Sequence, residues 1–491
     1  MFPSIGLEIH IELNTRSKMF CSCCNNPEEK RANFNICPIC LGQPGVLPVI
    51  NKKAIEMAIK TALSLNCKIS SLSYFERKNY FYPDLPKGYQ ISQYEAPLCK
   101  EGYLIIPFKN KKIRIQRIHL EEDTGALLHP TGVDYSLIDF NRAGIPLMEL
   151  VTEPDINSSK EASLFAQELQ LILRYLGVSN ADMEKGQMRI EANISVSSVK
   201  ENRKNLRDIL GTKVEIKNLN SFRALEKALE YEIERQIELL KNGKKILQET
   251  RGWDDLKKIT FSQREKEESK DYRYFPEPDL PPLEISQKEI EEIKRTIPEL
   301  PQMKRERFQK EYFLSDSEIE IFIKNQELSN FFEEIILQLK KQKEVSLKDL
   351  PRFIKTTTNY LQSDLQGVMK NKNLEFKNLK INPENFAQLI LFLEQGKISS
   401  KVAKDLIPEI VISGVLVSSF VKEKGLVQIE DDKKIEEVVQ KIIENNQKAT
   451  EDFKKGKENA LQYLIGQVMK ETKGRLNPQK IKEIMIRVLK N

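Results

Sequence analysis

Acidic residues and histidines gather at three places in the first third of the sequence, where they could bind a hard cation. Glu8 and His10 lie two residues apart on a segment of alternating polarity, so on a strand they would project from one face, about 6.6 Å apart. The string from His119 to Asp123 places three carboxylates beside a histidine, and Glu149 follows a turn-like segment. Like charges packed together cost free energy unless a cation neutralises them, and oxygen ligands with one imidazole suit Mg²⁺ with nucleotide phosphates, or Mn²⁺. The alternative is that each group is only a solvated strand face.

Five of the seven cysteines lie within one short segment. Cys21, Cys23 and Cys24 come first, and Cys37 and Cys40 form a C-x-x-C turn. Two short turns that present closely spaced thiols can build a tetrahedral site, in which Zn²⁺ holds thiolates about 2.3 Å away. The spacing predicts structural zinc held by Cys21, Cys23, Cys37 and Cys40, with Cys24 as an extra thiol. Reduced thiols or an iron–sulfur cluster are the alternatives, and the choice between Cys23 and Cys24 as ligand is open.

Positive charge is concentrated at the end of the chain. The net charge is +6, but residues 461–491 hold seven basic residues and two glutamates, which gives this segment a net charge of +5. A basic terminal segment on a nearly neutral body favours contact with a polyanion, most often nucleic acid. The alternative is a solvated helix face in a lysine-rich protein. Candidates for the contact are Lys473, Arg475, Lys480 and Arg487.

Length and composition predict a folded protein outside the membrane. A chain of 491 residues predicts about three domains, and 40% hydrophobic with 31% charged residues is typical of globular proteins. No apolar run reaches the ~18 residues that a spanning helix needs. The strand pattern begins directly after Met1, so we expect no signal segment and a cytoplasmic location.

Common catalytic motifs are absent from the sequence. There is no phosphate-binding loop of the form G-x-x-x-x-G-K-[ST], no G-x-G-x-x-G opening a helix and no G-x-S-x-G. Outside the cysteine cluster, no Cys/His pair is typical of a nucleophile and its base. An enzyme with this sequence would therefore bind nucleotide without the common loops, and would lack a hydrolase nucleophile of its own.

Hydrophobic periodicity divides the chain into a mixed first part and a helical second part. Segments of period two, such as residues 5–13, predict strands, and a capping box at Ser158 with a stop at Gly177 predicts one of the helices between them. Beyond about residue 290 the apolar residues follow helical spacing. The predicted fold is α+β over residues 1–290, with a helical domain at 291–415 and a small helical tail domain at 416–491.

Two runs are rich in tyrosine and proline, residues 78–93 and 271–279. Such runs are most often proline-stiffened loops whose rings pack on the domain. Polar groups interleaved with the rings, at Lys87, Tyr89 and Gln90, could instead line a polar tunnel or a binding cleft.

Six strings occur in a fixed order along the chain: Gly6–His10, Lys78–Pro83, His119–Asp123, Asp139–Glu149, Lys217–Phe222 and Asp271–Pro278. With the tail string Leu464–Met469, they resemble the GatB family, which supplies one component of the tRNA-dependent amidotransferase, the enzyme that corrects Glu-tRNA(Gln) and Asp-tRNA(Asn). The resemblance covers essentially the whole chain. The corresponding component of the archaeal enzyme is also similar, but it carries a large inserted domain for which this chain has no room.

The resemblance implies a cradle-shaped α+β domain similar to glutamine synthetase, then a helical domain, then a helical tail that contacts tRNA. It implies that ATP and Mg²⁺ are used to phosphorylate the side-chain carboxylate of the misacylated residue, which ammonia converts to the amide. On a strand Glu121 and Glu122 face opposite ways, so which of them faces the metal is open. Carried over by motif, Glu8, His10, Glu122 and Glu149 would be catalytic, and would bind Mg²⁺ together with Glu191.

The resemblance also implies partners, in a heterotrimeric, glutamine-hydrolysing carbon–nitrogen ligase. A partner amidase (glutaminase) would release ammonia, and a small linking protein would complete the heterotrimer. Ammonia would travel through a hydrophilic channel to which Lys78, Lys87 and Tyr89 contribute, and the basic tail would bind tRNA(Gln) or tRNA(Asn). Zinc is found in part of the family, and whether Gln-tRNA, Asn-tRNA or both are made is open. The alternative function is a non-catalytic, zinc-containing tRNA-binding scaffold.

Overall fold

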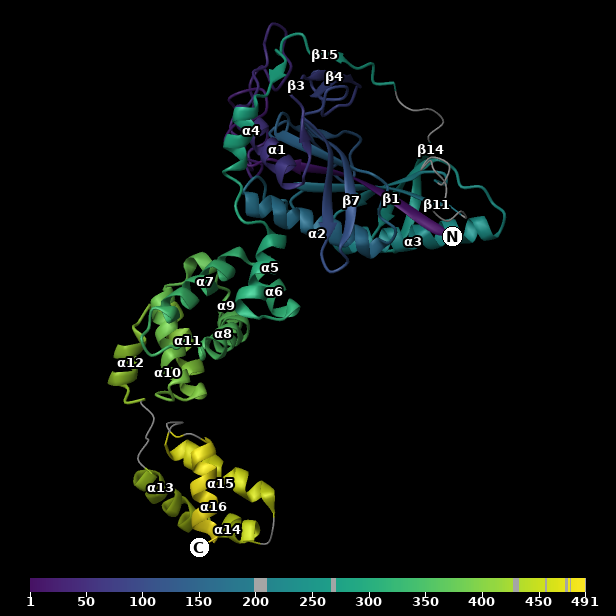
Figure 1. Ribbon diagram of the computed structural model, residues 1–491. Helices are drawn as coiled ribbons and strands as arrows, with labels where there is room; N and C mark the ends of the chain where they lie inside the picture. The colour runs from purple at the N-terminus through teal and green to yellow at the C-terminus, as the bar shows by residue number, and fades with distance from the viewer. Residues whose placement is uncertain are drawn as a thin grey trace. The chain divides into compact units, whose positions relative to one another are not determined.

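The computed structural model describes residues 1–197, 210–265, 271–426, 432–454, 457–472, 476 and 478–490 (Figure 1). Residue contacts divide the chain into two compact units, residues 1–303 and 304–491. The first unit is built on a large sheet and the second contains helices. The prediction of an α+β fold is confirmed, whereas the predicted domain limits at 290 and 415 and the likeness to glutamine synthetase stay predictions.

A nine-stranded sheet forms the centre of the first unit, in the order β14-β13-β12-β11-β1-β10-β7-β6-β2. Neighbours are antiparallel except β12 and β13, which are parallel because a helix, α3, connects them. The strands are β1 (Phe2–Glu12), β2 (Lys68–Ile69), β6 (Cys99–Ile106), β7 (Lys111–Glu122), β10 (Pro146–Thr152), β11 (Met188–Ser197), β12 (Val214–Leu219), β13 (Glu249–Asp254) and β14 (Ile259–Glu265).

The two faces of this sheet differ in polarity. In β1 the fully buried Leu7, Ile9 and Ile11 alternate with Glu8 and His10, so the apolar and polar side chains point to opposite faces. β1 pairs with β10 on one side and β11 on the other, which places it among the inner strands of the sheet. The sheet therefore has one apolar face that forms the core and one polar face that is available for chemistry.

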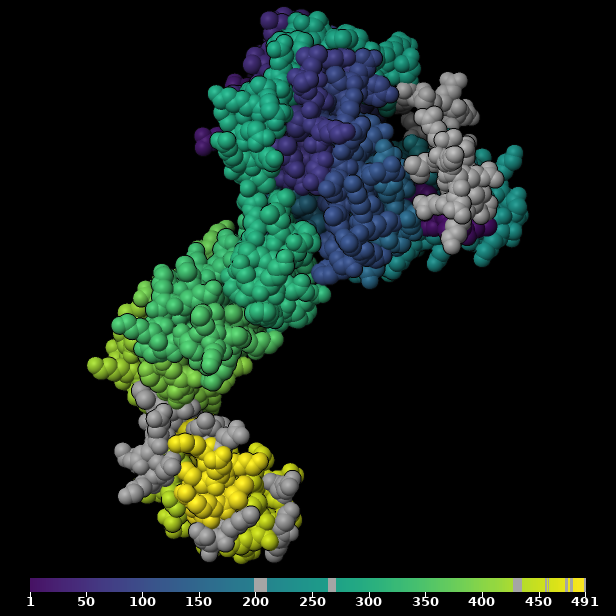
Figure 2. All heavy atoms as spheres, viewed as in Figure 1, coloured from purple at the N-terminus to yellow at the C-terminus, as the bar shows by residue number. Residues whose placement is uncertain are grey.

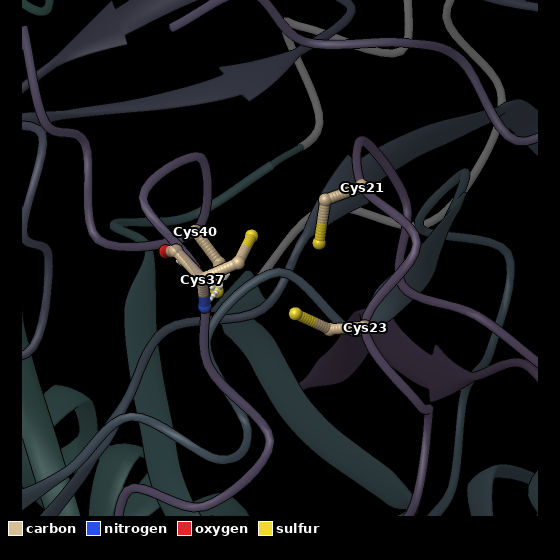
Figure 3. Close-up of side chains that lie close together, drawn as sticks. All are labelled: Cys21, Cys23, Cys37 and Cys40. Atoms are coloured by element: carbon tan, nitrogen blue, oxygen red, sulfur yellow. Dashed lines mark hydrogen bonds between the residues drawn. The ribbon is translucent and has the colours of Figure 1, made fainter.

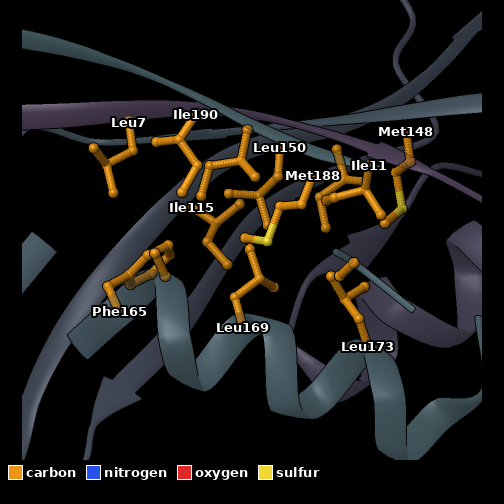
Figure 4. Packing of buried hydrophobic residues seen from close by; sticks show 14 of the residues in the cluster. Leu7, Ile11, Ile115, Met148, Leu150, Phe165, Leu169, Leu173, Met188 and Ile190 are labelled. Atoms are coloured by element: carbon orange, nitrogen blue, oxygen red, sulfur yellow. The ribbon is translucent and has the colours of Figure 1, made fainter. Parts of the chain in front are cut away.

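Helices cover the apolar face. They are α1 (Lys52–Ser64), α2 (Ser159–Leu176) and α3 (Phe222–Lys241). From α2, Phe165, Leu169 and Leu173 point at the sheet residues, as Figure 4 shows. The predicted ends of α2 are confirmed, because the Ser158 side chain accepts a hydrogen bond from the Glu161 backbone N–H at 3.3 Å and Gly177 ends the helix with φ 68°. The left-handed conformation favours glycine there.

Smaller sheets lie beside the large one. Three strands form the order β15-β4-β5, and two further pairs are β16-β3 and β8-β9. The space-filling view shows residues near 290, from α4, side by side with residues from the first hundred (Figure 2). The segments are β3 (Leu72–Ser73), β4 (Glu76–Asn79), β5 (Tyr89–Ser92), β8 (Ala126–Leu128), β9 (Leu137–Asp139), β15 (Phe275–Pro276), β16 (Leu283–Glu284), α4 (Gln287–Lys294) and, at the end of the unit, the start of α5 (Pro301–Tyr312).

The second unit is helical wherever it has regular structure among the described residues. A distinct hydrophobic cluster, which includes Val439, Leu464, Ile481 and Met485, lies within residues 435–489. None of the helices described is both long and apolar enough to cross a bilayer. The helices are α6 (Asp316–Lys324), α7 (Gln326–Lys340), α8 (Leu350–Asn359), η2 (Tyr360–Leu365), α9 (Gln366–Lys372), η3 (Phe376–Asn378), α10 (Pro383–Glu394), α11 (Ser400–Ser413), α12 (Val417–Glu423), α13 (Asp432–Asn445), α14 (Gln447–Lys454), α15 (Glu458–Glu471) and α16 (Pro478–Lys490).

The contact between α2 and the sheet should contribute strongly to stability. Leu169 is fully buried, so Leu169→Ala removes buried methyl groups and leaves a cavity, which typically costs about 2–5 kcal/mol. The free energy of unfolding, measured by urea denaturation, should fall by that amount. Leu256→Ala is the matched control because Leu256 is 95% exposed, and it should change the free energy little. Equal effects of the two changes would contradict the packing described.

Candidate metal centre and thiol cluster

Strand pairing brings three acidic or histidine side chains together on the polar face. Glu149 of β10 lies opposite His10 of β1 on one side and opposite His119 of β7 on the other. Two residues along β7, Glu121 projects from the same face as His119. These four residues, His10, His119, Glu121 and Glu149, are called the carboxylate–histidine cluster below.

Distances within the cluster are short enough for one ion. His10 Nε2 lies 3.5 Å from Glu121 Oε1 and 3.5 Å from Glu149 Oε2. One ligand atom from each of these three residues lies within 4.8 Å of the other two. His119 Nε2 lies 3.2 Å from Glu149 Oε2, and Ser92 Oγ donates to Glu121 Oε2 at 3.2 Å. Two carboxylates and an imidazole are a donor set that fits Mg²⁺ or Mn²⁺.

Electrostatics keep both carboxylates ionised. Burial raises the pKa of the Glu149 carboxyl, but His119 and His10 lower it by more, so the pKa lies well below its usual range. Burial also raises the pKa of Glu121, which His119 and Lys78 bring down below its ordinary value. Burial lowers the pKa of His119, yet Glu149 and Glu121 raise it to about 9. The carboxylates are therefore in the form that binds a cation, and a cation would compete with the proton on the imidazole.

Glu122 lies in a different environment from Glu121. Its carboxylate accepts hydrogen bonds from the Lys87 ammonium and, at 3.0 Å, from the backbone N–H of Ile91. Gln90 Nε2 donates to its backbone oxygen at 2.7 Å. The structure thus brings His10 and Glu149 together with Glu121 rather than with Glu122, and Glu122 forms an ion pair with Lys87 instead.

Glu8 and Glu191 lie opposite each other across β1 and β11, next to the cluster. Asn193 Nδ2 donates to Glu8 Oε1 at 2.7 Å, and Lys217 Nζ donates to both oxygens of Glu191 at 2.8 Å. Neither glutamate belongs to the group of His10, Glu121 and Glu149, whose ligand atoms lie within 4.8 Å of one another. Both lie on the polar face, so they extend the acidic surface along the sheet rather than close a single coordination sphere.

Lys78, Lys87 and Tyr89 come from the small sheet, on or directly before its strands. Burial lowers the pKa of the Lys78 ammonium, but Glu121, Tyr274 and Glu149 raise it by more, so Lys78 stays protonated. Lys87 Nζ lies 5.6 Å from the Tyr89 ring. A cavity of about 100 Å³ is lined by Lys87, Tyr89 and Glu122 together with residues of the cysteine segment, among them Cys21 and Cys40. A larger cavity of about 880 Å³ lies between α1 and α4 and is lined by none of these residues.

The four thiols of Cys21, Cys23, Cys37 and Cys40 converge on one point, as Figure 3 shows. Their sulfur atoms all lie within 4.8 Å of one another, and the Cys37 and Cys40 sulfurs are 3.8 Å apart. Four sulfurs held tetrahedrally at about 2.3 Å from one ion would be roughly 3.8 Å apart. Cys24 is exposed and is not part of the group. These four cysteines could therefore bind a metal ion.

The basic residues of the tail are only partly within the described structure. Lys480 and Arg487 lie exposed on α16, where Arg487 Nη2 is 3.3 Å from Glu436 Oε2. Lys473 and Arg475 lie outside the described residues. The nucleic-acid contact of this segment stays a prediction.

Two groups at the site were not predicted from the sequence as site residues. His119 was noted only as a neighbour of the acidic string, yet it contacts Glu149, and its Nδ1 is buried without a hydrogen-bond partner among the described atoms. Lys217, which binds Glu191, lies in the motif Lys217–Phe222. The period-two pattern around Lys217 could have placed it on the polar face, but no local signal identifies its partner.

The fold and the site define an α+β protein with a candidate metal centre on the polar face of its sheet and a separate four-thiol cluster. Residues 3–291 match the family described as the GatB/GatE catalytic domain, and residues 330–489 match the GatB domain. The chain therefore belongs to the GatB family, which confirms the resemblance.

Similar proteins cover nearly the full length of the chain. It is 48% identical over 493 residues to the B component of the aspartyl/glutamyl-tRNA(Asn/Gln) amidotransferase of Thermotoga maritima, an alignment that spans 99% of this chain and 98% of the relative. Proteins of the same name are 48% identical in Thermodesulfovibrio yellowstonii, over 99% and 98% of the two chains, and 46% identical in Carboxydothermus hydrogenoformans, over 98% and 97%.

Proposed function

We propose that the chain is the component of a tRNA-dependent amidotransferase that phosphorylates and amidates the side chain of Glu-tRNA(Gln), Asp-tRNA(Asn) or both. The observation that carries the proposal is the carboxylate–histidine cluster, in a chain 48% identical over its full length to proteins with that name. The two ionised, nearly buried carboxylates are balanced by the histidines and Lys78, and His10 Nε2 lies 3.5 Å from both of them, where a metal ion would replace its proton.

The reaction has two steps that need different help from the protein. A carboxylate oxygen is a poor leaving group, so the side-chain carboxylate first attacks the γ-phosphorus of ATP, and ADP leaves. Ammonia then attacks the carbonyl carbon of the acyl phosphate, and inorganic phosphate leaves as the amide forms. Mg²⁺, when bound by Glu121, Glu149 and His10, would neutralise charge on the transferring phosphoryl group and orient it. Glu8 and Glu191 lie beside these ligands on the same face.

The ammonia source would be a partner amidase, because the sequence has no hydrolase nucleophile motif. A small third protein would complete the complex. Lys87, Glu122 and Tyr89 would form part of the ammonia route, since they line the cavity of about 100 Å³ that Cys21 and Cys40 also line. Lys78 would stand at the end of that route, where its ammonium is attracted by Glu121 and Glu149. The four thiolates would hold a structural Zn²⁺, which would fix the cysteine segment that lines the same cavity.

Reconstitution tests the proposed function. The full chain with its partner proteins should form Gln-tRNA(Gln) from Glu-tRNA(Gln), ATP, Mg²⁺ and ammonium, with one ADP released for each amide. Asp-tRNA(Asn) supplied in parallel reports the second substrate. If neither amide formed although both tRNAs were bound, the result would favour the non-catalytic scaffold over the enzyme.

The exposed basic residues of α16 should add to tRNA affinity by releasing counterions. Replacing Lys480, Lys482 and Arg487 by alanine should reduce the slope of log K against log [salt] by up to about 2.7, since each phosphate contact contributes about 0.9. Filter binding over a salt series measures it, and the glutaminase activity of the complex should not change. The control variant replaces three exposed lysines of the same unit, Lys341, Lys343 and Lys348. An unchanged slope in the α16 variant would contradict the tail as a tRNA contact.

A further inference from the structure

Four tyrosine rings form a continuous row beside the carboxylate–histidine cluster. Tyr94 stacks on Tyr274 with ring centroids 4.5 Å apart and planes 12° apart. Tyr274 meets Tyr272 edge-on at 6.1 Å, and Tyr272 meets Tyr80 edge-on at 6.0 Å. These four rings are called the tyrosine row below.

The row lies close to the charged groups of the site. Lys78 Nζ is 5.2 Å from the Tyr272 ring. Burial raises the pKa of the Tyr274 hydroxyl to about 12, with Lys78 opposing the rise and Glu121 and Glu149 adding to it. Two members of the row are therefore within electrostatic reach of the residues proposed to bind the metal.

Backbone and side-chain contacts fix the segment that carries two of the rings. Arg77 binds Glu277 through two hydrogen bonds, at 2.7 and 2.8 Å, and the Glu277 side chain is fully buried. Asn79 Nδ2 donates to the backbone oxygens of Tyr272, at 3.2 Å, and of Arg273, at 2.8 Å. Arg273 adopts a left-handed φ of 48° between the two rings. Because these supports are already in place, the rings need little ordering to receive a ligand.

Core packing does not account for the row. Tyr94 is 55% exposed, and the other three rings are half-buried rather than part of the hydrophobic core of the unit. The Arg273 side chain, which lies between Tyr272 and Tyr274 in the sequence, is 84% exposed and 4.0 Å from Asp271. Exposed or half-buried rings outside the core, with a cation beside them, are what proteins use to stack the bases of single-stranded nucleic acid.

We propose that the tyrosine row stacks the unpaired 3′-terminal bases of the aminoacyl-tRNA, so that the esterified amino acid reaches the carboxylate–histidine cluster. This inference rests on the proposed function, which makes an aminoacyl-tRNA the substrate. The row comprises four rings with neighbouring centroids 4.5–6.1 Å apart, so it extends further than a single base does. A short single strand therefore fits it better than the adenine of ATP.

Binding of two forms of one tRNA tests the inference without catalysis. The tRNA(Gln) transcript is used with its 3′-terminal CCA and with those three nucleotides removed, on the full chain in its complex. The wild type should bind the intact form roughly tenfold more tightly, because stacking on an aromatic ring contributes substantially for each base. The Tyr94→Ala/Tyr274→Ala variant should lose that preference and bind both forms with the affinity that the wild type shows for the shortened tRNA.

Two further variants separate stacking from structural effects. Tyr94→Phe/Tyr274→Phe keeps both rings and should keep the tenfold preference. Phe108→Ala removes another exposed ring, 64% exposed, at the turn before β7 and roughly 35 Å along the strand from Glu121, so it should also keep the preference.

Three results would overturn the inference. They are a variant that weakens both tRNA forms equally, a wild type with no preference, and a variant that raises KM for ATP while the preference for the intact end persists. The last result would assign the row to the adenine of ATP. Amide formation by the wild type is measured alongside, so a failure of the proposed function is seen separately from a failure of the stacking.

Discussion

Replacing Glu149 by glutamine should lower kcat for amide formation about a thousandfold, because a metal ligand at a phosphoryl-transfer site is worth several kcal/mol of transition-state stabilisation. Glu149 lies opposite both His10 and His119, so it is the central carboxylate of the cluster. Glu121→Gln should act in the same direction. Both variants should need more Mg²⁺ for half-maximal activity, which a magnesium titration of ADP release measures.

Two control variants make this prediction specific. Glu101→Gln changes an exposed glutamate of β6 that pairs with Lys68, and it should leave kcat unchanged. Glu122→Gln removes the partner of Lys87, so it should affect glutamine-dependent turnover and leave the magnesium dependence as in the wild type. If Glu122→Gln shifted the magnesium dependence and Glu121→Gln did not, the metal ligand would be the other glutamate. Thermal unfolding of each variant confirms that it is folded.

Cys37→Ser should remove zinc from the protein and destabilise the segment around it. A tetrahedral site with three thiolates binds zinc much more weakly, and the zinc-binding free energy of such sites is itself folding free energy. Metal analysis should give about one zinc per chain in the wild type and much less than one in the variant. The unfolding temperature should fall with it, and a strong chelator should have the same effect on the wild type.

Cys24→Ser is the matched control for the thiol cluster. Cys24 neighbours Cys23 in the sequence but is exposed and outside the convergent group, so the variant should keep its zinc. If the Cys24→Ser variant lost its zinc and a Cys23→Ser variant kept it, Cys24 rather than Cys23 would be the zinc ligand. A wild type purified without stoichiometric metal would contradict the zinc site altogether.

Local patterns were enough where the relevant contacts are local. The alternation in residues 5–13 places Glu8 and His10 on one face, because the period of a strand is two whatever its neighbours are. The cysteine group follows from two short turns, and the structure brings together the same four thiols. The ends of α2 follow from Ser158 and Gly177 for the same reason.

Pairing between distant strands determines which side chains meet at the site, and local sequence patterns do not show that pairing. At the end of β7 Leu120, Glu121 and Glu122 are all buried, so their burial gives no phase, and only the pairing of Leu120 with Met148 sets which carboxylate faces His10. The contact of His119 with Glu149 depends on the same register. The tyrosine row brings Tyr80 and Tyr94 beside Tyr272 and Tyr274, nearly 200 residues along the chain, so neither aromatic run indicates it alone.

Trapping the acyl phosphate shows whether this chain itself makes that intermediate. The full chain in its complex is given Glu-tRNA(Gln), ATP and Mg²⁺ without glutamine or ammonium, and hydroxylamine is added as the nucleophile. Hydroxylamine also cleaves the ester to the tRNA and gives the α-hydroxamate, which is separated before counting. Attack of hydroxylamine on the acyl phosphate should release phosphate and form the γ-glutamyl hydroxamate, with one ADP for each γ-hydroxamate. Wild-type complex should accumulate it and the Glu149→Gln complex should not. Amide formation from ammonium by the wild type with no γ-hydroxamate, or γ-hydroxamate undiminished in the variant, would contradict an acyl phosphate made at the carboxylate–histidine cluster.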